Sequence, residues 1–137
     1  MAKILVIDDD LDFRASVRAI LRSDGHDVIE ADSGKAGLRK VVESQPDLIL
    51  LDIMMESASE GYGLNQAIKF QDTYAAFRHI PIVMISSIEL SPDELYGVAG
   101  EVDMIRPDGY VTKPLNIPQF REVVRKFTSR VTVASPD

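Results

Sequence analysis

The stretch that decides the fold is KILVIDDDLDF, residues 3–13. Four apolar residues, Ile4 to Ile7, run directly into three aspartates, and Asp12 follows one residue later. Such an apolar run is typical of a strand buried on both faces. Carboxylates this close together resist ionisation, so either solvent dilutes their repulsion or a cation binds there. We interpret Asp10 and Asp12 as first-turn acids of the following helix.

The composition is that of one globular domain. The chain has 137 residues, 45% of them apolar and 27% charged, and a chain of this length buries about two-thirds of its unfolded surface. It has no cysteine, which excludes disulfides, zinc–thiolate sites and a thiol nucleophile. We expect no signal peptide and no membrane span, because no apolar stretch approaches ~20 residues. The net charge of −7 argues against direct nucleic-acid binding, and we expect a cytoplasmic protein.

Along the chain, short apolar runs alternate with segments whose apolar residues recur at helical spacing. Strands are expected at residues 3–7, 26–31, 47–51, 80–85 and 109–112. Helical segments follow them, with caps at Ser33, Ser91 and Asn116, stops at Gly25 and Pro46, and a weaker helix at 62–70. Five βα units predict an α/β fold with a parallel sheet and helices on both faces. We expect residues 129–137 to form a disordered tail.

Residues that can do chemistry follow four of these strands. They are Asp8 and Asp9 after the first strand, Asp52 after the third, Ser86 after the fourth and Lys113 after the fifth. In an open parallel sheet these strand ends meet at one edge, where ligands bind. Clustered carboxylates suit Mg2+, which takes oxygen ligands. A carboxylate can also accept a phosphoryl group, whose charge a cation and a hydroxyl then balance.

At these residues the chain resembles the receiver domains of two-component response regulators. The matching motifs are VIDDD (6–10), LILLDIMM (48–55), IPIVMISS (80–87) and YVTKP (110–114), in the order of the family. The resemblance implies a receiver domain at residues 1–128 with a flavodoxin-like (βα)5 fold. Such a fold is a doubly wound sandwich, whose five-stranded parallel sheet has the order 2-1-3-4-5.

The resemblance also implies roles for individual residues. Asp52 would accept a phosphoryl group from the phosphohistidine of a histidine kinase or phosphotransfer protein, and Lys113 would pair with it at rest. Mg2+ would be bound directly by Asp9 and Asp52 together with the backbone carbonyl of Met54. Asp8 would act largely through a metal-bound water.

Two further residues hold the switch positions of the family. Ser86 would move to bond the new phosphoryl group, and Tyr110 would rotate inward with it. A core aromatic is the alternative for Tyr110. The Lys113–Pro114 bond would be cis. Phosphorylation would switch the surface that binds an unidentified downstream protein, and the domain would not be an enzyme beyond promoting its own phosphorylation and dephosphorylation. A homodimer through the fourth and fifth helices is compatible with the resemblance.

Three segments depart from the family pattern. They lie at residues 56–63, where Glu56 stands in place of an expected proline, at 70–79 and at 100–109. Glu56 adds a negative charge near the expected site.

Two other functions stay open. A receiver fold that is never phosphorylated would be a protein-interaction module, although such folds usually lose one of the key residues. A haloacid-dehalogenase-type phosphatase would use Asp8 as nucleophile and Asp10 as acid–base. That family expects Thr or Val where this chain has Asp12, and an acidic pair where it has Ser86 and Ser87.

Overall fold

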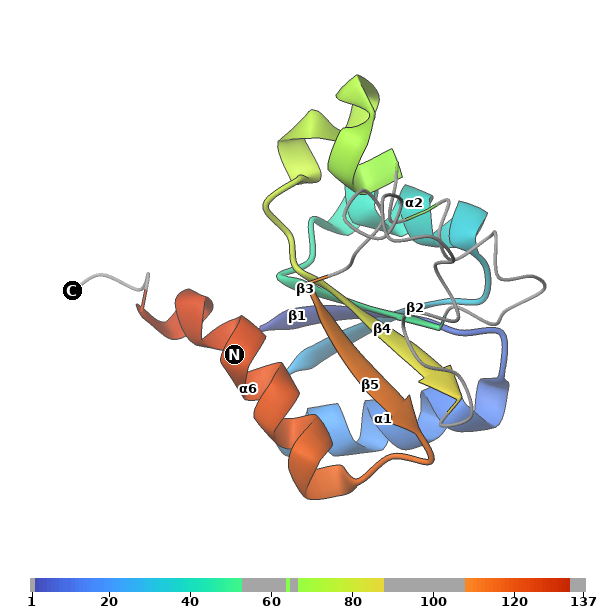
Figure 1. Ribbon diagram of the computed structural model, residues 1–137, viewed down its shortest axis with the longest axis vertical. Helices are drawn as coiled ribbons and strands as arrows, with labels where there is room; N and C mark the ends of the chain where they lie inside the picture. The colour runs from blue at the N-terminus through green and yellow to red at the C-terminus, as the bar shows by residue number, and fades with distance from the viewer. Residues whose placement is uncertain (1, 53–63, 65–66, 88–107, 134–137) are drawn as a thin grey trace, which may run out of the picture.

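Five parallel strands form one sheet in the computed structural model, which describes residues 2–52, 64, 67–87 and 108–133. The strands are β1 (Lys3–Ile7), β2 (Asp27–Ala31), β3 (Leu48–Asp52), β4 (Ile82–Ser87) and β5 (Gly109–Lys113). Their order is β2-β1-β3-β4-β5 (Figure 1). This is the order expected for a flavodoxin-like fold, so the predicted fold class is confirmed.

Helices cover both faces of the sheet (Figure 1). Helices α1 (Leu11–Ser23) and α6 (Ile117–Val133) lie on one face, and α2 (Gly34–Ser44) lies on the other with the short 3-10 helix η1 (Asp72–Phe77). Because successive strand residues point to opposite faces, β1 and β3 supply both cores. The first core contains Ile4, Val6, Leu48 and Leu50, and the second contains Leu5, Ile7, Ile49 and Leu51.

The helix starts follow the capping residues of the sequence. Asp10 caps α1, since its carboxylate accepts hydrogen bonds from the backbone N–H groups of Asp12 and Phe13 at 3.0 and 3.2 Å. Ser33 caps α2, and the side-chain oxygen of Asn116 accepts a hydrogen bond at the start of α6. The interpretation of Asp10 as part of the helix start is therefore confirmed.

Most strand boundaries lie within one residue of the expectation, but those of β4 and the end of α6 differ by more. Strand β4 begins at Ile82 rather than at residue 80, because Pro81 has no N–H to donate and joins the sheet only through its carbonyl, which accepts from Ile49 N–H. Helix α6 continues past residue 128 to Val133. Thr128 is buried and its hydroxyl donates to the carbonyl of Val124 at 2.8 Å, so the first part of the expected tail is helical.

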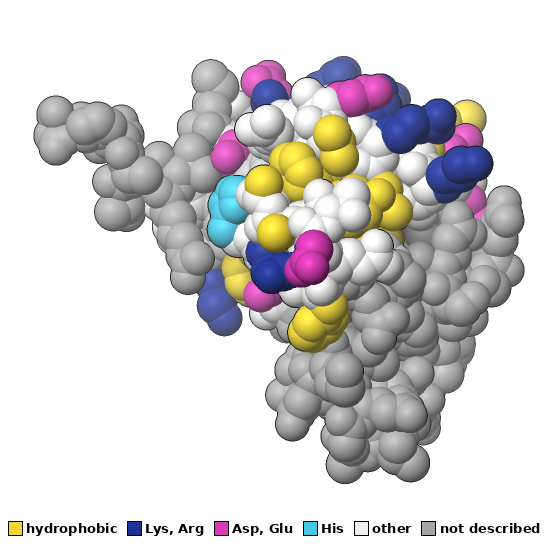
Figure 2. Space-filling view, turned by 90° about the horizontal axis from the view of Figure 1, so that it is seen from above, with side chains coloured by type: hydrophobic (Ala, Val, Ile, Leu, Met, Phe, Trp, Pro, Cys, Tyr) yellow, Lys and Arg dark blue, Asp and Glu magenta, His cyan; other side chains and the backbone are white. Residues whose placement is uncertain are grey.

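The divergent segment at residues 70–79 forms η1. Its Tyr74 and Phe77 pack against the core beneath α2. Figure 2 looks down on this side of the molecule, where apolar side chains gather among lysines and arginines. The exposed side chains here include Val42 of α2, at 47%, and Phe70, at 52%. Segment 56–63, residues 100–107 and the helix expected after Ser91 lie outside the described residues.

None of the helices in the part of the chain that the structure describes is long and apolar enough to cross a membrane.

Candidate functional site

The register between β1 and β3 brings two acids together. Ile7 pairs with Leu51, so Asp8 and Asp52 leave the sheet side by side at its carboxyl edge. Carboxylate oxygens of Asp8, Asp9 and Asp52 lie within 4.8 Å of one another. The convergence predicted for these three aspartates is therefore observed.

These aspartates differ in burial and in electrostatic environment. Asp8 is completely buried and Asp52 is 3% exposed, whereas Asp9 is exposed. Burial raises the pKa of Asp8 from 3.8 to about 6. A hydrogen bond from the N–H of Asp10 (2.8 Å) opposes this rise, the charge of Asp52 adds to it and that of Lys113 opposes it. The pocket thus holds more negative charge than its own groups balance.

Lys113 brings a positive charge to two of these carboxylates. Its Nζ lies 3.2 Å from Oδ2 of Asp8 and 3.6 Å from Oδ2 of Asp52. The expected pairing with Asp52 is present, but the hydrogen bond of Lys113 goes to Asp8. The same ammonium lies 4.2 Å from the centre of the Phe13 ring. The Lys113–Pro114 peptide is cis, as the resemblance implied.

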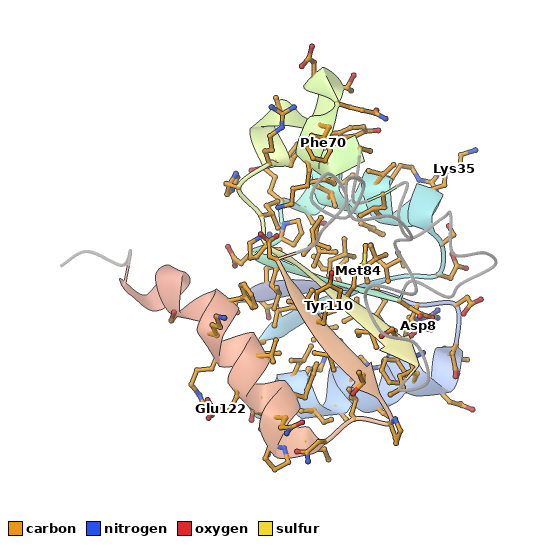
Figure 3. The ribbon with its side chains drawn as sticks, viewed as in Figure 1. Asp8, Lys35, Phe70, Met84, Tyr110 and Glu122 are labelled. Atoms are coloured by element: carbon orange, nitrogen blue, oxygen red, sulfur yellow. The ribbon has the colours of Figure 1, made fainter. Side chains whose placement is uncertain are left out.

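Ser86 and Tyr110 lie at different depths in the sheet. Ser86 is buried near the carboxyl end of β4 and pairs with Thr112, next to the lysine. Tyr110 pairs with Met84, farther from the carboxyl edge, where Figure 3 shows the two side by side at a distance from Asp8. The Tyr110 ring packs against the core on the α2 face with its hydroxyl buried. The switch roles of Ser86 and Tyr110 stay predictions.

Other residues of interest fall outside the site or outside the described part of the chain. Asp10 is used as the cap of α1 and Asp12 is exposed in the first turn of that helix, so neither joins the cluster. Met54, whose carbonyl the resemblance assigns to Mg2+, and Glu56 lie outside the described residues.

Two site residues were not found from the sequence. Phe13 packs against the core that α1 covers, and its ring also lies under the ammonium of Lys113. Arg14 donates from Nη1 to the backbone carbonyl of Asp8 at 2.6 Å. The only available signal was position: Arg14 lies one turn into the helix that follows the aspartates, from where a long side chain can reach back to the strand end.

The arrangement has a definite chemistry. All three acidic groups offer hard oxygen donors, which suit a small divalent cation. Asp52 presents a carboxylate, a group that can act as a nucleophile, at the end of β3, and Lys113 lies within reach of it. Phosphoryl transfer needs a nucleophile of this kind with positive charge around it.

Comparison with known proteins gives consistent matches. The family described as the response regulator receiver domain matches residues 4–125. Protein PilG of Pseudomonas aeruginosa is 33% identical over 130 residues, which cover 95% of this chain and 90% of PilG. The crystallised chemotaxis response regulator CheY4 of Vibrio cholerae superposes with a TM-score of 0.76 at 27% identity, over 93% of this chain and 98% of CheY4.

Some relatives are longer than this chain. The probable transcriptional regulator ycf27 of Porphyridium aerugineum is 30% identical over 133 residues, which cover 97% of this chain and 50% of the regulator. The DNA-binding regulator RpaA of Synechocystis is likewise matched over 50% of its length, at 31% identity. The chain therefore spans about half the length of these two relatives.

Proposed function

The chain belongs to the response regulator receiver domain family, and from this premise we propose that Asp52 accepts a phosphoryl group from the phosphohistidine of a histidine kinase or phosphotransfer protein. The observation that carries the proposal is the cluster at the carboxyl edge of the sheet. Oxygens of Asp8, Asp9 and Asp52 lie within 4.8 Å of one another, and Lys113 is 3.6 Å from Asp52. A carboxylate acceptor beside further acids and a lysine is what formation of an aspartyl phosphate needs from the protein, and this supports the proposal.

The donor set fits Mg2+. It consists of carboxylate oxygens, two of the three acids are buried, and Lys113 faces those two. Burial raises the pKa of Asp8 most and the charge of Asp52 raises it further, and a bound cation would oppose both effects by stabilising the ionised carboxylate. We propose that Asp9 and Asp52 hold the ion directly with the carbonyl of Met54, and that Asp8 acts through a water. When bound, Mg2+ would neutralise charge on the phosphoryl oxygens.

The residues of this chain then have separate tasks. An oxygen of Asp52 forms the bond to phosphorus while the bond from phosphorus to the donor imidazole nitrogen breaks. The imidazole leaves as a neutral ring, because its other nitrogen carries a proton. Lys113, held above Phe13, is close enough to turn from Asp8 to the new phosphoryl oxygens. Ser86 would donate its hydroxyl to them.

Phosphorylation would act on a downstream protein by shifting the domain between two arrangements. The movement of Ser86 toward the phosphoryl group would leave space into which Tyr110 rotates, and the altered surface would bind a downstream protein. In this function the domain is a signalling phosphoacceptor rather than an enzyme with a separate substrate. We place it in the cytoplasm, where the kinase domains that phosphorylate receivers work.

Phosphorylation can be tested directly with a small donor. Acetyl phosphate with Mg2+ is expected to add one phosphoryl group to the wild type and none to Asp52→Asn, as measured by intact-protein mass spectrometry. Asp12→Asn is the matched control, because Asp12 is exposed on α1 and outside the cluster, and it should be labelled like the wild type. An unlabelled wild type, under conditions that label another receiver, would favour the protein-interaction module.

The phosphatase alternative conflicts with one contact. Its acid–base would be Asp10, yet that carboxylate accepts two backbone hydrogen bonds as the cap of α1. Sustained hydrolysis of p-nitrophenyl phosphate that depends on Asp8 would restore this alternative.

A further inference from the structure

A network of two arginines and one glutamate ties the first helix to the edge strand beside the aspartates. The carboxylate of Glu30, in β2, accepts hydrogen bonds from Nε of Arg14 at 3.2 Å and from Nη1 of Arg18 at 2.6 Å, one on each oxygen. Arg14 is the less exposed of the two cations, at 14% against 34% for Arg18. Both arginines come from α1, so Glu30 holds this helix against the sheet.

Only one of these two arginines contacts an aspartate of the cluster. Nη1 of Arg14 donates to the backbone carbonyl of Asp8 at 2.6 Å, while the contacts of Arg18 in the described structure go to Glu30. On its other side, the N–H of Asp8 donates to the carbonyl of Ala31 at 3.1 Å. The peptide groups on either side of Asp8 are thus both held, and with them the direction in which the chain enters Asp9.

The network also controls the charge near the site. An unpaired guanidinium beside Asp8 would oppose the entry of a cation. Burial alone would raise the pKa of Glu30, but the hydrogen bonds and charges of Arg18 and Arg14 outweigh it and hold this pKa below its ordinary value. Glu30 is therefore ionised at neutral pH and balances Arg14.

We propose that Arg14 is a positioning residue for the Mg2+ site, which fixes the Asp8–Asp9 turn through the carbonyl of Asp8 while Glu30 fixes and neutralises its guanidinium. This inference rests on the proposed function, because it assumes that the aspartates bind Mg2+. Groups that orient the ligands of a metal typically change its affinity by 10–100-fold when removed.

The test compares two substitutions that remove the same charge from the same helix. Arg14→Met and Arg18→Met both take one partner from Glu30, but only the first releases the carbonyl of Asp8. Mg2+ is titrated into the full-length chain at pH 7 and followed by backbone amide chemical shifts. Urea unfolding in EDTA reports the stability of each metal-free variant separately from its Mg2+ affinity.

A positioning role and a purely electrostatic role of Arg14 predict opposite changes in the Kd for Mg2+. If Arg14 positions the turn, the Kd for Mg2+ rises about tenfold in Arg14→Met and stays within about twofold in Arg18→Met. If Arg14 acted only as a nearby charge, removing it would tighten Mg2+ binding, and that result overturns the proposal. Equal Kd values for the wild type and Arg14→Met also overturn it, whatever the change in stability.

Two further variants keep the test decisive. Glu30→Gln removes the negative charge that balances Arg14 and one of the two carboxylate oxygens that hold the arginines. Mg2+ binding should therefore weaken, and unchanged binding would contradict the proposal. If Arg14→Met does not fold, Arg14→Lys takes its place in the test. It retains the charge, but its one ammonium has to serve both Glu30 and the carbonyl of Asp8. Its Kd should rise severalfold, and a wild-type Kd would refute the positioning role. A wild type that binds no Mg2+ would overturn the proposed function itself, and this inference with it.

Discussion

Replacing Asp8 by asparagine is expected to stabilise the metal-free protein. Asp8 is completely buried, and its carboxylate is ionised at neutral pH against the charge of Asp52. Asparagine has the same shape and keeps an oxygen that can accept the hydrogen bond from the N–H of Asp10. The substitution therefore removes a buried negative charge without opening a cavity.

The magnitude follows from the pKa of Asp8. Burial raises it from 3.8 to about 6, so the folded state binds the proton more tightly than the unfolded chain does. The contribution of Asp8 to stability is fully present below pH 4 and is lost as the pH rises through 6. At about 1.36 kcal/mol per pH unit, the loss approaches about 3 kcal/mol at pH 7. Because Lys113 loses a partner in the variant, we expect a net gain of about 1–3 kcal/mol.

Urea denaturation in EDTA measures this difference across a pH series. The variant and the wild type should have similar unfolding free energies near pH 4, and the variant should be the more stable at pH 7. Mg2+ should then stabilise the wild type, as a ligand that binds only the folded state does, and should have much less effect on the variant. Asp10→Asn is the control, because asparagine caps a helix about as well as aspartate.

Two results would refute this reasoning. If Asp8→Asn were less stable than the wild type at pH 7, the ion pair with Lys113 would outweigh the cost of burying the carboxylate. If the difference did not change between pH 4 and pH 7, the pKa of Asp8 would not be raised in the folded protein.

Other expectations concern the packing far from the site. Lys69→Met should lower the unfolding free energy in urea by about 1–3 kcal/mol, because Lys69 Nζ contacts Asp108 at 2.9 Å and the carbonyl of Ile80 at 3.2 Å. Arg121→Met, which breaks a more exposed pair with Asp24, should cost less than about 1 kcal/mol, and equal losses would contradict the difference in burial. Gly109→Ala should cost about 1–3 kcal/mol, since its Cβ would lie 2.9 Å from the Phe127 ring. Phe127→Leu should reduce that cost in a double-mutant cycle, and strict additivity would argue against a clash.

The sheet was predictable because its central strands are buried on both faces. The continuous apolar runs at residues 4–7 and 48–51 are short and bounded by turn signals, which favours buried strands over helices. The end of α6 was less predictable, because the burial of Thr128 depends on what it packs against. The structure of η1 was not predictable either, since 3-10 turns have no strong periodicity.

The candidate site was predictable in its members and less so in its contacts. Asp8, Asp9, Asp52 and Lys113 follow strands whose ends must meet in a parallel sheet, so the topology alone brings them together. Whether Lys113 lies nearer Asp8 or Asp52 depends on a difference of a few tenths of an ångström, 3.2 against 3.6 Å. The contact of Arg14 with Asp8 depends on how α1 packs against the end of β1, which no local pattern contains.

The pairing of β1 with β3 also determines where this chain can change length. Ile7 lies opposite Leu51, so the two buried aspartates stand next to each other only while both strands keep their residue count. One residue inserted or deleted within β3 would move Asp52 by about 3.3 Å and turn its side chain to the other face of the sheet. A connection such as 70–79 can grow without moving either acid. Insertions among related chains should therefore accumulate in the connections and be absent from the two central strands.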